Sequence, residues 1–242
     1  MGKRKILITG ATGRIGGYLG RHWQDKYDLR LTDRRPLDYD IIGGTEFIQA
    51  GISNLDEMRA LCDGVDTVVH LAADPSPKAN FFESLLDNNV IGLFNGFQAA
   101  ADQGCRRVVY ASSVNSVLGH PNGYEITESS PIHPMNHYGA CKVLGEALAW
   151  SFFHKHELTT VCIRFGMVCT KETPEIKDPD DEVNWISGRD IGNLVERSIE
   201  IGGIEVVVAH GVSRHQNCRY SIAQTCAQLG YTPLEGTATL TE

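Results

Sequence analysis

The chain has 242 residues, of which 42% are hydrophobic and 21% charged, as in an ordinary folded globular protein. Its formal net charge of −8 argues against a protein that binds nucleic acid or coats anionic membranes. No apolar run approaches the roughly 18 residues of a membrane-spanning helix, and the first residues do not resemble a signal peptide. We therefore expect a cytoplasmic protein with free thiols and no metal site.

Apolar, β-branched runs alternate with helical patterns along most of the chain. Strands are expected at residues 5–10, 28–33, 45–50, 66–73, 106–113 and 159–168. Helices are expected at 14–24, after Asn54 as N-cap, at about 80–102 and around HYGACK at 137–142. Beyond residue 170 we expect an exposed charged loop, a helix at 187–202, a strand at 205–211 and a helix at 221–230. This order predicts an α/β fold, a doubly wound parallel sheet that binds ligands at the carboxyl ends of its strands.

The segment TGATGRIG joins the first strand to the first helix and contains Gly10, Gly13 and Gly16. Glycines at these places allow a sharp turn, let a diphosphate approach the backbone and let the helix pack closely on the sheet. The N-terminus of the helix offers free N–H groups to the phosphates. The loop therefore predicts a dinucleotide site, to which Arg14 and Ile15 of the same loop also contribute.

The residue that ends the second strand, Asp33, is where a dinucleotide-binding protein holds a ribose hydroxyl with a carboxylate. Its charge would repel a 2′-phosphate, so NAD is the expected cofactor. Arg34 and Arg35 follow directly and could accept that phosphate, which keeps NADP as the less favoured alternative.

In HYGACK, Tyr138 and Lys142 lie four positions apart and share one face of the predicted helix. A tyrosine ordinarily titrates near pH ~10 and is a poor base at neutral pH. A cation beside it would lower the pKa of the phenol. We therefore expect Lys142 to turn Tyr138 into a base.

Taken together, TGxxGxxG, HLAA after the fourth strand, the serines that end the fifth strand and YxxxK resemble the short-chain dehydrogenase/reductases. The extended class of NAD-dependent epimerases and dehydratases is the nearest, and within it VVYASSVNSVLG, HYGACK and ETPE are similar to the uronate dehydrogenases. The resemblance runs from residue 5 to about 234 and implies a Rossmann fold. It implies an NAD(P)-binding domain over residues 1–169 and a small C-terminal portion, 170–242, that packs on it and caps the substrate.

The same resemblance implies the roles of individual side chains. Tyr138 would be the catalytic base, Lys142 its partner and a ligand of the nicotinamide ribose, and Ser113 the residue that orients the substrate hydroxyl. Ser112 is the alternative serine, although the spacing to Tyr138 favours Ser113. The implied cofactor contacts are Leu71, Ala72, Ala73 and Asn89, and the implied substrate contacts are Ser76, Asn115 and Met167. Asn89 is equally compatible with a structural role in its helix.

The chain departs from the uronate dehydrogenases after the sixth strand. The arginine that grips a carboxylate there is missing from TPEIKDPDDEVNW, where Asp180 takes its place, so Arg164 and Arg189 remain as possible substitutes. We therefore expect NAD-dependent oxidation of a secondary or anomeric hydroxyl in a free sugar or uronic acid. Epimerisation or dehydration of a nucleotide-linked sugar is the alternative, although such relatives carry a longer C-terminal part. A non-catalytic cofactor-binding sensor is a third possibility.

Many members of this class form dimers through the fourth and fifth helices. Phe81, Phe94, Phe97 and Trp150 lie on the corresponding segments and are compatible with such an interface or with an ordinary core. A homodimer is the expected assembly, and a small molecule the expected binding partner.

Overall fold

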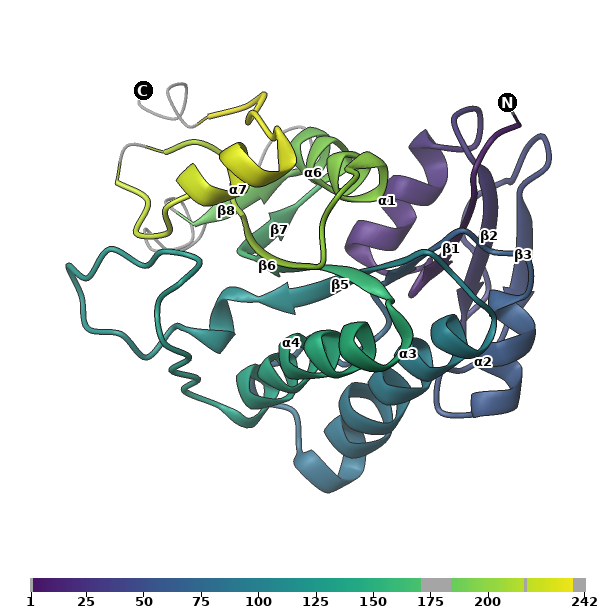
Figure 1. The fold of residues 1–242 in the computed structure, drawn as a ribbon, viewed down its shortest axis with the longest axis horizontal. Helices are drawn as coiled ribbons and strands as arrows, with labels where there is room; N and C mark the ends of the chain where they lie inside the picture. Colours follow the sequence, from purple (N-terminus) through teal and green to yellow (C-terminus); the bar gives the residue numbers. More distant parts are fainter. Residues whose placement is uncertain (1, 171–183, 216, 237–242) are drawn as a thin grey trace.

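Seven parallel strands form the central sheet, in the order β3-β2-β1-β4-β5-β6-β9 (Figure 1). The computed structural model describes residues 2–170, 184–215 and 217–236. The strands of the sheet are β1 (Lys5–Thr9), β2 (Asp28–Asp33), β3 (Glu46–Gln49), β4 (Thr67–His70), β5 (Arg107–Ser113), β6 (Thr159–Phe165) and β9 (Val206–Gly211). A separate parallel pair consists of β7 (Met167–Cys169) and β8 (Trp185–Ser187).

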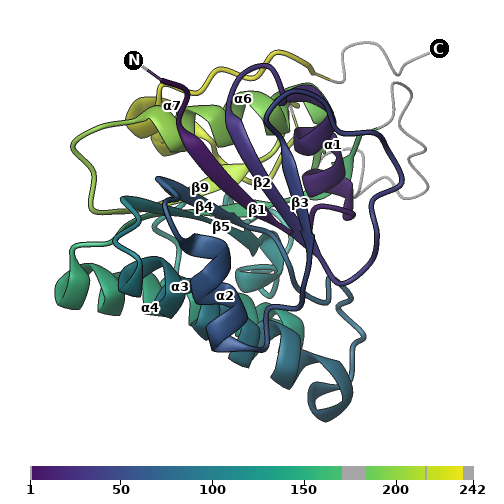
Figure 2. The ribbon, with the colours of Figure 1, turned by 90° about the vertical axis from the view of Figure 1, so that its right-hand side faces the viewer.

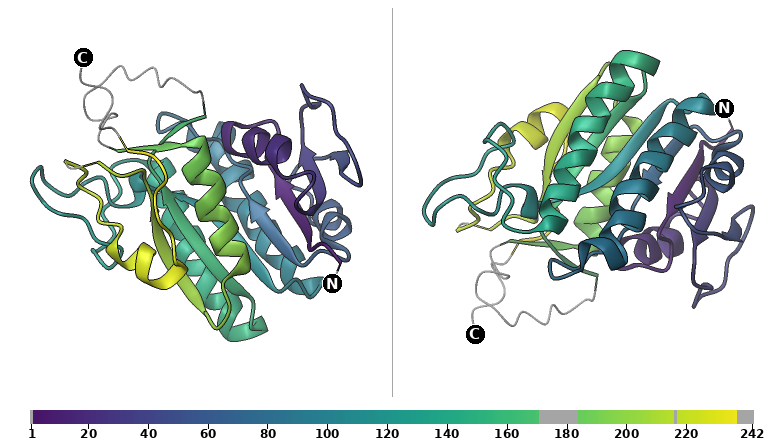
Figure 3. Two further views of the ribbon diagram at one scale, coloured as in Figure 1. Left: turned by 90° about the horizontal axis from the view of Figure 1, so that it is seen from above. Right: turned by 90° about the horizontal axis from the view of Figure 1, so that it is seen from below.

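Helices cover both faces of the sheet. They are α1 (Arg14–His22), α2 (Leu55–Cys62), the π-helix η1 (Phe81–Ile91), α3 (Gly92–Asp102), the short 3-10 helix η2 (Val114–Ser116), α4 (His137–His156), α6 (Gly188–Glu200) and α7 (Ala223–Leu229). Figure 2 shows α1, α6 and α7 on one face and α2, α3 and α4 on the other. Figure 3 shows α6 over the strands from one side and α3 beside α4 from the other.

Each face of the sheet has its own apolar core. Along β1, Ile6 and Ile8 are buried in the cluster under α1 and α6, while Leu7 between them is buried in the cluster under α2 and α3. Successive side chains of a strand point to opposite faces. A strand that is covered on both sides therefore reads as an uninterrupted apolar run, which is why the β1 sequence was recognisable.

The predicted alternation of strands and helices is confirmed, with three differences in detail. The strand expected at 66–73 ends at His70, and the one expected at 159–168 divides into β6 and β7, because β7 pairs with β8 instead of the central sheet. The helix expected at 80–102 is continuous, but its first half is a π-helix, in which Gly92 N–H bonds to the carbonyl of Asp87. The N-cap at Asn54 is confirmed, since its side chain accepts from the N–H groups of Asp56 and Glu57.

The C-terminal portion contributes directly to the central sheet. Strand β9 is its seventh strand and pairs with β6, while α6 packs against α1. Strand β9 and helix α6 thus belong to the same core as the strands before them, and a capping function for the C-terminal portion stays a prediction. The charged loop expected after residue 170 and Asp180 lie outside the described residues.

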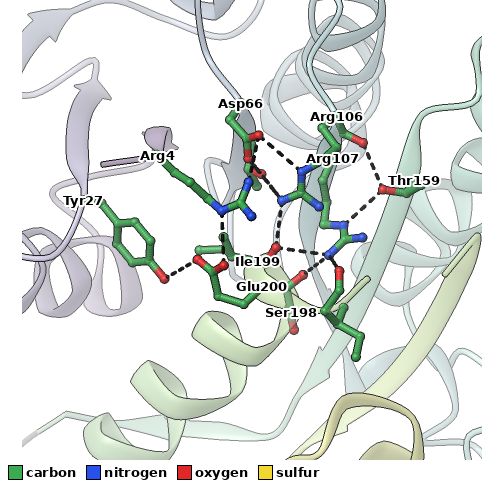
Figure 4. Close-up of polar contacts among 11 residues, drawn as sticks. Arg4, Tyr27, Asp66, Arg106, Arg107, Thr159, Ser198, Ile199 and Glu200 are labelled. Atoms are coloured by element: carbon green, nitrogen blue, oxygen red, sulfur yellow. Dashed lines mark hydrogen bonds and ion pairs between the residues drawn. The ribbon is translucent and has the colours of Figure 1, made fainter. Parts of the chain in front are cut away.

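Two neighbouring arginine side chains hold the end of α6 against the sheet, at the amino ends of the strands (Figure 4). Arg107, fully buried at the start of β5, donates from Nη1 to the carbonyls of Ser198 and Ile199 at 2.9 and 3.1 Å. Arg106 bridges Ile199 O, at 2.8 Å, to the Asp66 carboxylate. These bonds satisfy carbonyls that the end of a helix leaves without partners. They fix the position of α6 at the edge opposite to the predicted site.

Candidate active site

The glycine loop lies between β1 and α1, at the point where the strand order reverses between β1 and β4. Gly10 has φ +72°, and a Cβ atom there would lie 2.9 Å from the backbone N of Ala72. A Cβ atom on Gly16 would lie 2.2 Å from the carbonyl O of Gly10. Glycine is therefore required at both positions, by the left-handed backbone at Gly10 and by close packing at Gly16. Gly13 is the N-cap residue of α1, and Arg14 and Ile15 are the first residues of the helix. Arg14 is exposed, whereas Ile15 packs against the core.

The carboxylate of Asp33 is held against this loop. One oxygen accepts from Thr12 N–H at 3.1 Å and the other from Arg35 N–H at 3.1 Å. The guanidinium of Arg35 folds over the Thr12 hydroxyl, 2.8 Å away, and lies 3.9 Å from Asp33. Arg34 is exposed. A carboxylate oxygen can accept more than one hydrogen bond, so Asp33 retains the capacity to accept from a ribose hydroxyl.

The Thr9 hydroxyl explains why β4 is shorter than predicted. It accepts from the N–H groups of Leu71 and Ala72, at 3.1 and 3.2 Å, and bonds to Nδ1 of His70 at 3.1 Å. The chain is thereby turned away from the sheet beside Gly10. Burial lowers the pKa of His70 to about 3, so this imidazole is neutral at physiological pH. The backbone of Leu71 and Ala72 therefore lies directly against Gly10 of the glycine loop.

Asn89 fixes the loop that follows β4. Its side-chain Oδ1 accepts from Asp74 N–H at 2.8 Å, and its Nδ2 donates to Asp74 O at 3.0 Å. The Asp74 carboxylate accepts in turn from Ser76 N–H, at 2.9 Å, and from the Ser84 hydroxyl, at 2.5 Å. The geometry thus gives Asn89 the structural role that was left open, and it places Ser76 on a loop with a rigid backbone.

Tyr138 and Ser113 meet at the carboxyl end of β5. Tyr138, at the start of α4, is buried, and its phenol lies near the Ser113 hydroxyl, which acts to lower its pKa. The Ser113 hydroxyl accepts from Asn115, whose side-chain oxygen Oδ1 accepts from Asn136 Nδ2 at 2.9 Å. Asn136 is the N-cap of α4 and accepts from the backbone N–H of Gly139, the third helical residue, at 2.7 Å. A single chain of hydrogen bonds therefore orients Ser113 relative to the start of α4, where Tyr138 lies.

Lys142 lies one turn after Tyr138 on the same side of α4. Its Nζ donates to Ala111 O at 2.8 Å and lies 5.4 Å from the centre of the Tyr138 ring and 5.2 Å from that of Tyr110. Burial lowers the pKa of Lys142 to about 8. Burial and, to a lesser degree, the charge of Asp74 raise the pKa of Tyr138, and the Ser113 hydroxyl opposes them. The lower pKa that we expect from Lys142 stays a prediction.

The two neighbouring serines of β5 have different partners. Ser113 lies near Tyr138 and accepts from Asn115, whereas Ser112 donates to Glu146 at 2.6 Å. The structure therefore favours Ser113 at the site and gives Ser112 a structural partner. Glu146 is also bound by Arg164, which is 3% exposed, so Arg164 is not available to a substrate carboxylate.

Two other predicted positions lie on later elements. Arg189 is in the first turn of α6, and its exposed side chain pairs with Glu235 at 3.4 Å. Met167 is half-buried as the first residue of β7. The predicted contact of Met167 with the substrate stays a prediction.

A pocket of about 510 Å³ opens beside the start of α4. Segments 77–79 and 134–137 form its walls, together with Ala140. Sequence analysis did not find this pocket, nor the roles of Thr9, His70, Asp74 and Glu146. A polar side chain at a strand end, as in Thr9 and Asp74, was the available signal, but their partners come from other elements.

The geometry around the glycine loop fits a dinucleotide. Glycines form the tight turn where Cβ atoms at Gly10 and Gly16 would collide with the backbone, the N-terminus of α1 follows the turn, and a carboxylate lies at the end of β2. Among the described residues, no group of three His, Cys, Asp or Glu side chains is arranged to hold a metal ion. In the same part of the chain, no helix is long and apolar enough to cross a membrane. All seven cysteines are free thiols.

Comparisons with known proteins agree with this geometry. The family model of the NAD dependent epimerase/dehydratase family matches residues 6–202. An NAD-dependent glucose-6-phosphate dehydrogenase of Haloferax volcanii is 34% identical, over 98% of this chain and 95% of the relative. A uronate dehydrogenase of Pseudomonas putida is 27% identical, over 97% of this chain and 85% of its own length. A putative UDP-glucose 4-epimerase of Methanocaldococcus jannaschii is 29% identical, over 75% of this chain and 60% of its own length.

Solved structures give the same result. The uronate dehydrogenase from Agrobacterium tumefaciens superposes with a TM-score of 0.88 at 28% identity, over 100% of this chain and 91% of that one. A tyrosine-to-alanine variant of that enzyme, complexed with NAD, superposes with a TM-score of 0.87 at 28% identity, over 96% of this chain and 85% of that one.

Proposed function

The chain belongs to the NAD-dependent epimerase/dehydratase family, and on this premise we propose that it is an NAD-dependent dehydrogenase that oxidises a secondary or anomeric hydroxyl of a sugar. The observation that carries the proposal is that Tyr138 is buried beside Ser113 at the carboxyl edge of the sheet, with Lys142 one turn along α4. The relatives named as sugar and uronate dehydrogenases support it, because they match nearly the whole chain.

The glycine loop would hold the diphosphate of NAD, with Gly13 letting it approach the backbone. Asp33 would accept from the hydroxyls of the adenine ribose, and the neighbouring Arg34 and Arg35 keep NADP as the weaker alternative. The backbone of residues 71–73 would border the cofactor on the other side. NAD, when bound, supplies the acceptor for the hydride that leaves the substrate carbon.

Ser113 would hold the substrate hydroxyl, and Tyr138 would remove its proton. Asn115 keeps the Ser113 hydroxyl in place and, with Ser76 and Met167, is proposed to contact the substrate. Lys142 would bind the nicotinamide ribose. Because the pKa of Tyr138 is raised in the protein alone, we propose that the positive charge of the bound cofactor, added to that of Lys142, makes its phenol acidic enough to act.

The experiment that tests the proposal is a screen of the pure protein with NAD and, separately, with NADP. Reduced nicotinamide would be followed with uronates, aldoses, sugar phosphates and polyols as substrates. Steady reduction of NAD by any of these sugars supports the proposal, and no reduction by any of them contradicts it.

Epimerisation of a nucleotide-linked sugar is the second candidate, because the matched relatives include the putative UDP-glucose 4-epimerase. It would give a sugar epimer without net reduction of NAD. We rank it second because that match covers a smaller share of both chains than the dehydrogenase matches do. A sensor without turnover would not need Tyr138, Lys142 and Ser113 together.

We also propose that the enzyme is a cytoplasmic homodimer that pairs through α3 and α4. Phe97 is fully buried in the core, so it is no longer a candidate for the interface. Phe94 and Trp150 are each 43% exposed on this face and remain candidates. Light scattering of the wild-type protein and of a Phe94→Ser variant tests the assembly, and a monomeric wild type would overturn it.

A further inference from the structure

An acidic sugar needs a cation in the binding site, and the two arginines considered for this purpose are otherwise engaged. Arg164 is buried and gives two hydrogen bonds to Glu146, at 2.9 and 2.8 Å. Arg189 lies on the outer side of α6 and pairs with Glu235. If the substrate of the proposed dehydrogenase is an anion, another group must neutralise it.

The pocket beside α4 offers such a group close to Tyr138. Its walls carry Lys78 on one side and His137, the residue before Tyr138, on the other. Ala79 belongs to the lining of this pocket and also packs against the cluster that contains Tyr138. The pocket and the proposed base therefore share a wall, and a ligand in the pocket lies next to the reacting centre.

The electrostatic surroundings favour an anion in this pocket. Lys78 is exposed and forms no ion pair with any residue that the structure describes. No Asp or Glu side chain lines the pocket. In a chain with a net charge of −8, a free ammonium and an imidazole on facing walls form a local positive site. An imidazole can donate a hydrogen bond to an anion whether it is neutral or charged.

We infer that this pocket binds the phosphate group of a phosphorylated sugar substrate, with Lys78 as its counter-charge and His137 as a second donor; this rests on the dehydrogenase function proposed above. A phosphate monoester is close to doubly charged at neutral pH and is commonly bound by lysine as a point charge. The planar guanidinium of arginine matches a carboxylate best, because it donates two parallel hydrogen bonds to it. No arginine lines this pocket. The pocket is therefore better suited to a phosphate than to a uronate carboxylate.

The test compares the wild type with Lys78→Gln and with the matched control Lys155→Gln, an exposed lysine at the far end of α4. The kcat/KM of NAD reduction is measured with glucose 6-phosphate, glucose and glucuronate. We expect the wild type to prefer glucose 6-phosphate over glucose. Lys78→Gln should lower kcat/KM for glucose 6-phosphate about tenfold or more and leave that for glucose within about twofold. His137→Asn should lower kcat/KM for glucose 6-phosphate by a smaller factor. Lys155→Gln should leave kcat/KM unchanged for both glucose 6-phosphate and glucose.

A second readout does not depend on turnover. Calorimetric titration of glucose 6-phosphate into a Tyr138→Phe protein loaded with NAD should show binding that Lys78→Gln weakens about tenfold. Equal binding with and without Lys78 overturns the inference. Turnover of glucose or glucuronate with none of glucose 6-phosphate also overturns it, but leaves the proposed dehydrogenase intact. Phosphate-dependent binding without reduction of NAD by any sugar would support the pocket and contradict the dehydrogenase.

Discussion

Arg164 and Glu146 form a buried, bidentate ion pair between β6 and α4, with Nε and Nη2 of the arginine 2.9 and 2.8 Å from the two carboxylate oxygens. Glu146 lies one turn after Lys142 and two turns after Tyr138. The Arg164–Glu146 ion pair therefore holds α4, which carries Lys142 and Tyr138, against β6. The Ser112 hydroxyl adds a third bond to the same carboxylate, next to Ser113. The pair thus sets the register of α4 on the strand that carries the proposed substrate-orienting serine.

Removing the arginine should be costly. Arg164→Met leaves the Glu146 carboxylate buried without its cation, and such losses typically lower the free energy of unfolding by about 3–5 kcal/mol. Urea denaturation measures the effect. Arg189→Met is the matched control, since the Arg189 side chain is 69% exposed and exposed pairs contribute about 0–1 kcal/mol. Equal losses in the two variants would show that the buried pair does not stabilise the fold.

Tyr138→Phe removes the proposed base and keeps the ring in its packed position. We expect kcat to fall by about 10²- to 10⁴-fold, the usual contribution of a positioned acid or base. NAD binding, followed by fluorescence titration, should be nearly unchanged. Tyr27→Phe makes the same chemical change at the far edge of the sheet, where Tyr27 bonds to Glu200, and should keep its activity. Turnover of Tyr138→Phe near the wild-type rate would refute the assigned base.

Asp74→Asn tests the electrostatic environment of Tyr138. Burial, and after it the negative charge of Asp74, raises the pKa of Tyr138. Removing that charge should therefore lower the pKa of Tyr138. The rising, acidic limb of the profile of kcat/KM against pH, at saturating NAD, should then lie at lower pH. Asparagine still offers an oxygen to Ser76 N–H, so the loop can keep its conformation. The exposed Asp87→Asn on η1 is the control, and an identical shift there would mean that proximity to Tyr138 is not the cause.

Much of the fold was predictable because short stretches of the sequence show the pattern of the element that they form. The run KILITG gives a strand covered on both faces, and glycines at its end give the turn at Gly10. Tyr138 and Lys142 could be placed on one face of a helix from their spacing alone. Asn54 could be assigned as a cap because its partners are the next residues in the chain.

What the sequence did not predict depends on partners distant in the chain. The end of β4 is decided by the Thr9 hydroxyl, which captures the N–H groups of two residues more than sixty positions away. Arg164 looked like a candidate ligand because nothing local indicates that Glu146 neutralises it. The raised pKa of Tyr138 was not predicted for the same reason, since burial and the charge of Asp74 come from partners outside its own helix. Strand β8 was missed because a three-residue strand has almost no pattern of its own.

The buried lysine should make stability depend on pH in a particular direction. Burial lowers the pKa of Lys142 to about 8, from an ordinary value of 10.5. Below pH 8 the folded protein bears the cost of a buried charge that the unfolded chain does not. Between pH 8 and 10.5 the unfolded chain binds more protons than the folded one, so the contribution of this group to stability improves as pH rises. Above 10.5 both states are neutral and the cost is gone.

Lys142→Met is therefore expected to be more stable than the wild type at pH 7, by up to about 3 kcal/mol on the conversion of a pKa shift into free energy. The gain is reduced by the lost hydrogen bond to Ala111 O. The difference between the two proteins should shrink as the pH of the urea titration is raised from 8 to 10.5. Lys155→Met, which removes an exposed lysine from the same helix, should give a difference that does not vary with pH. The difference in the free energy of unfolding between Lys142→Met and the wild type could instead stay constant or increase over this range. That result would mean that the lysine is charged in the folded protein at little cost.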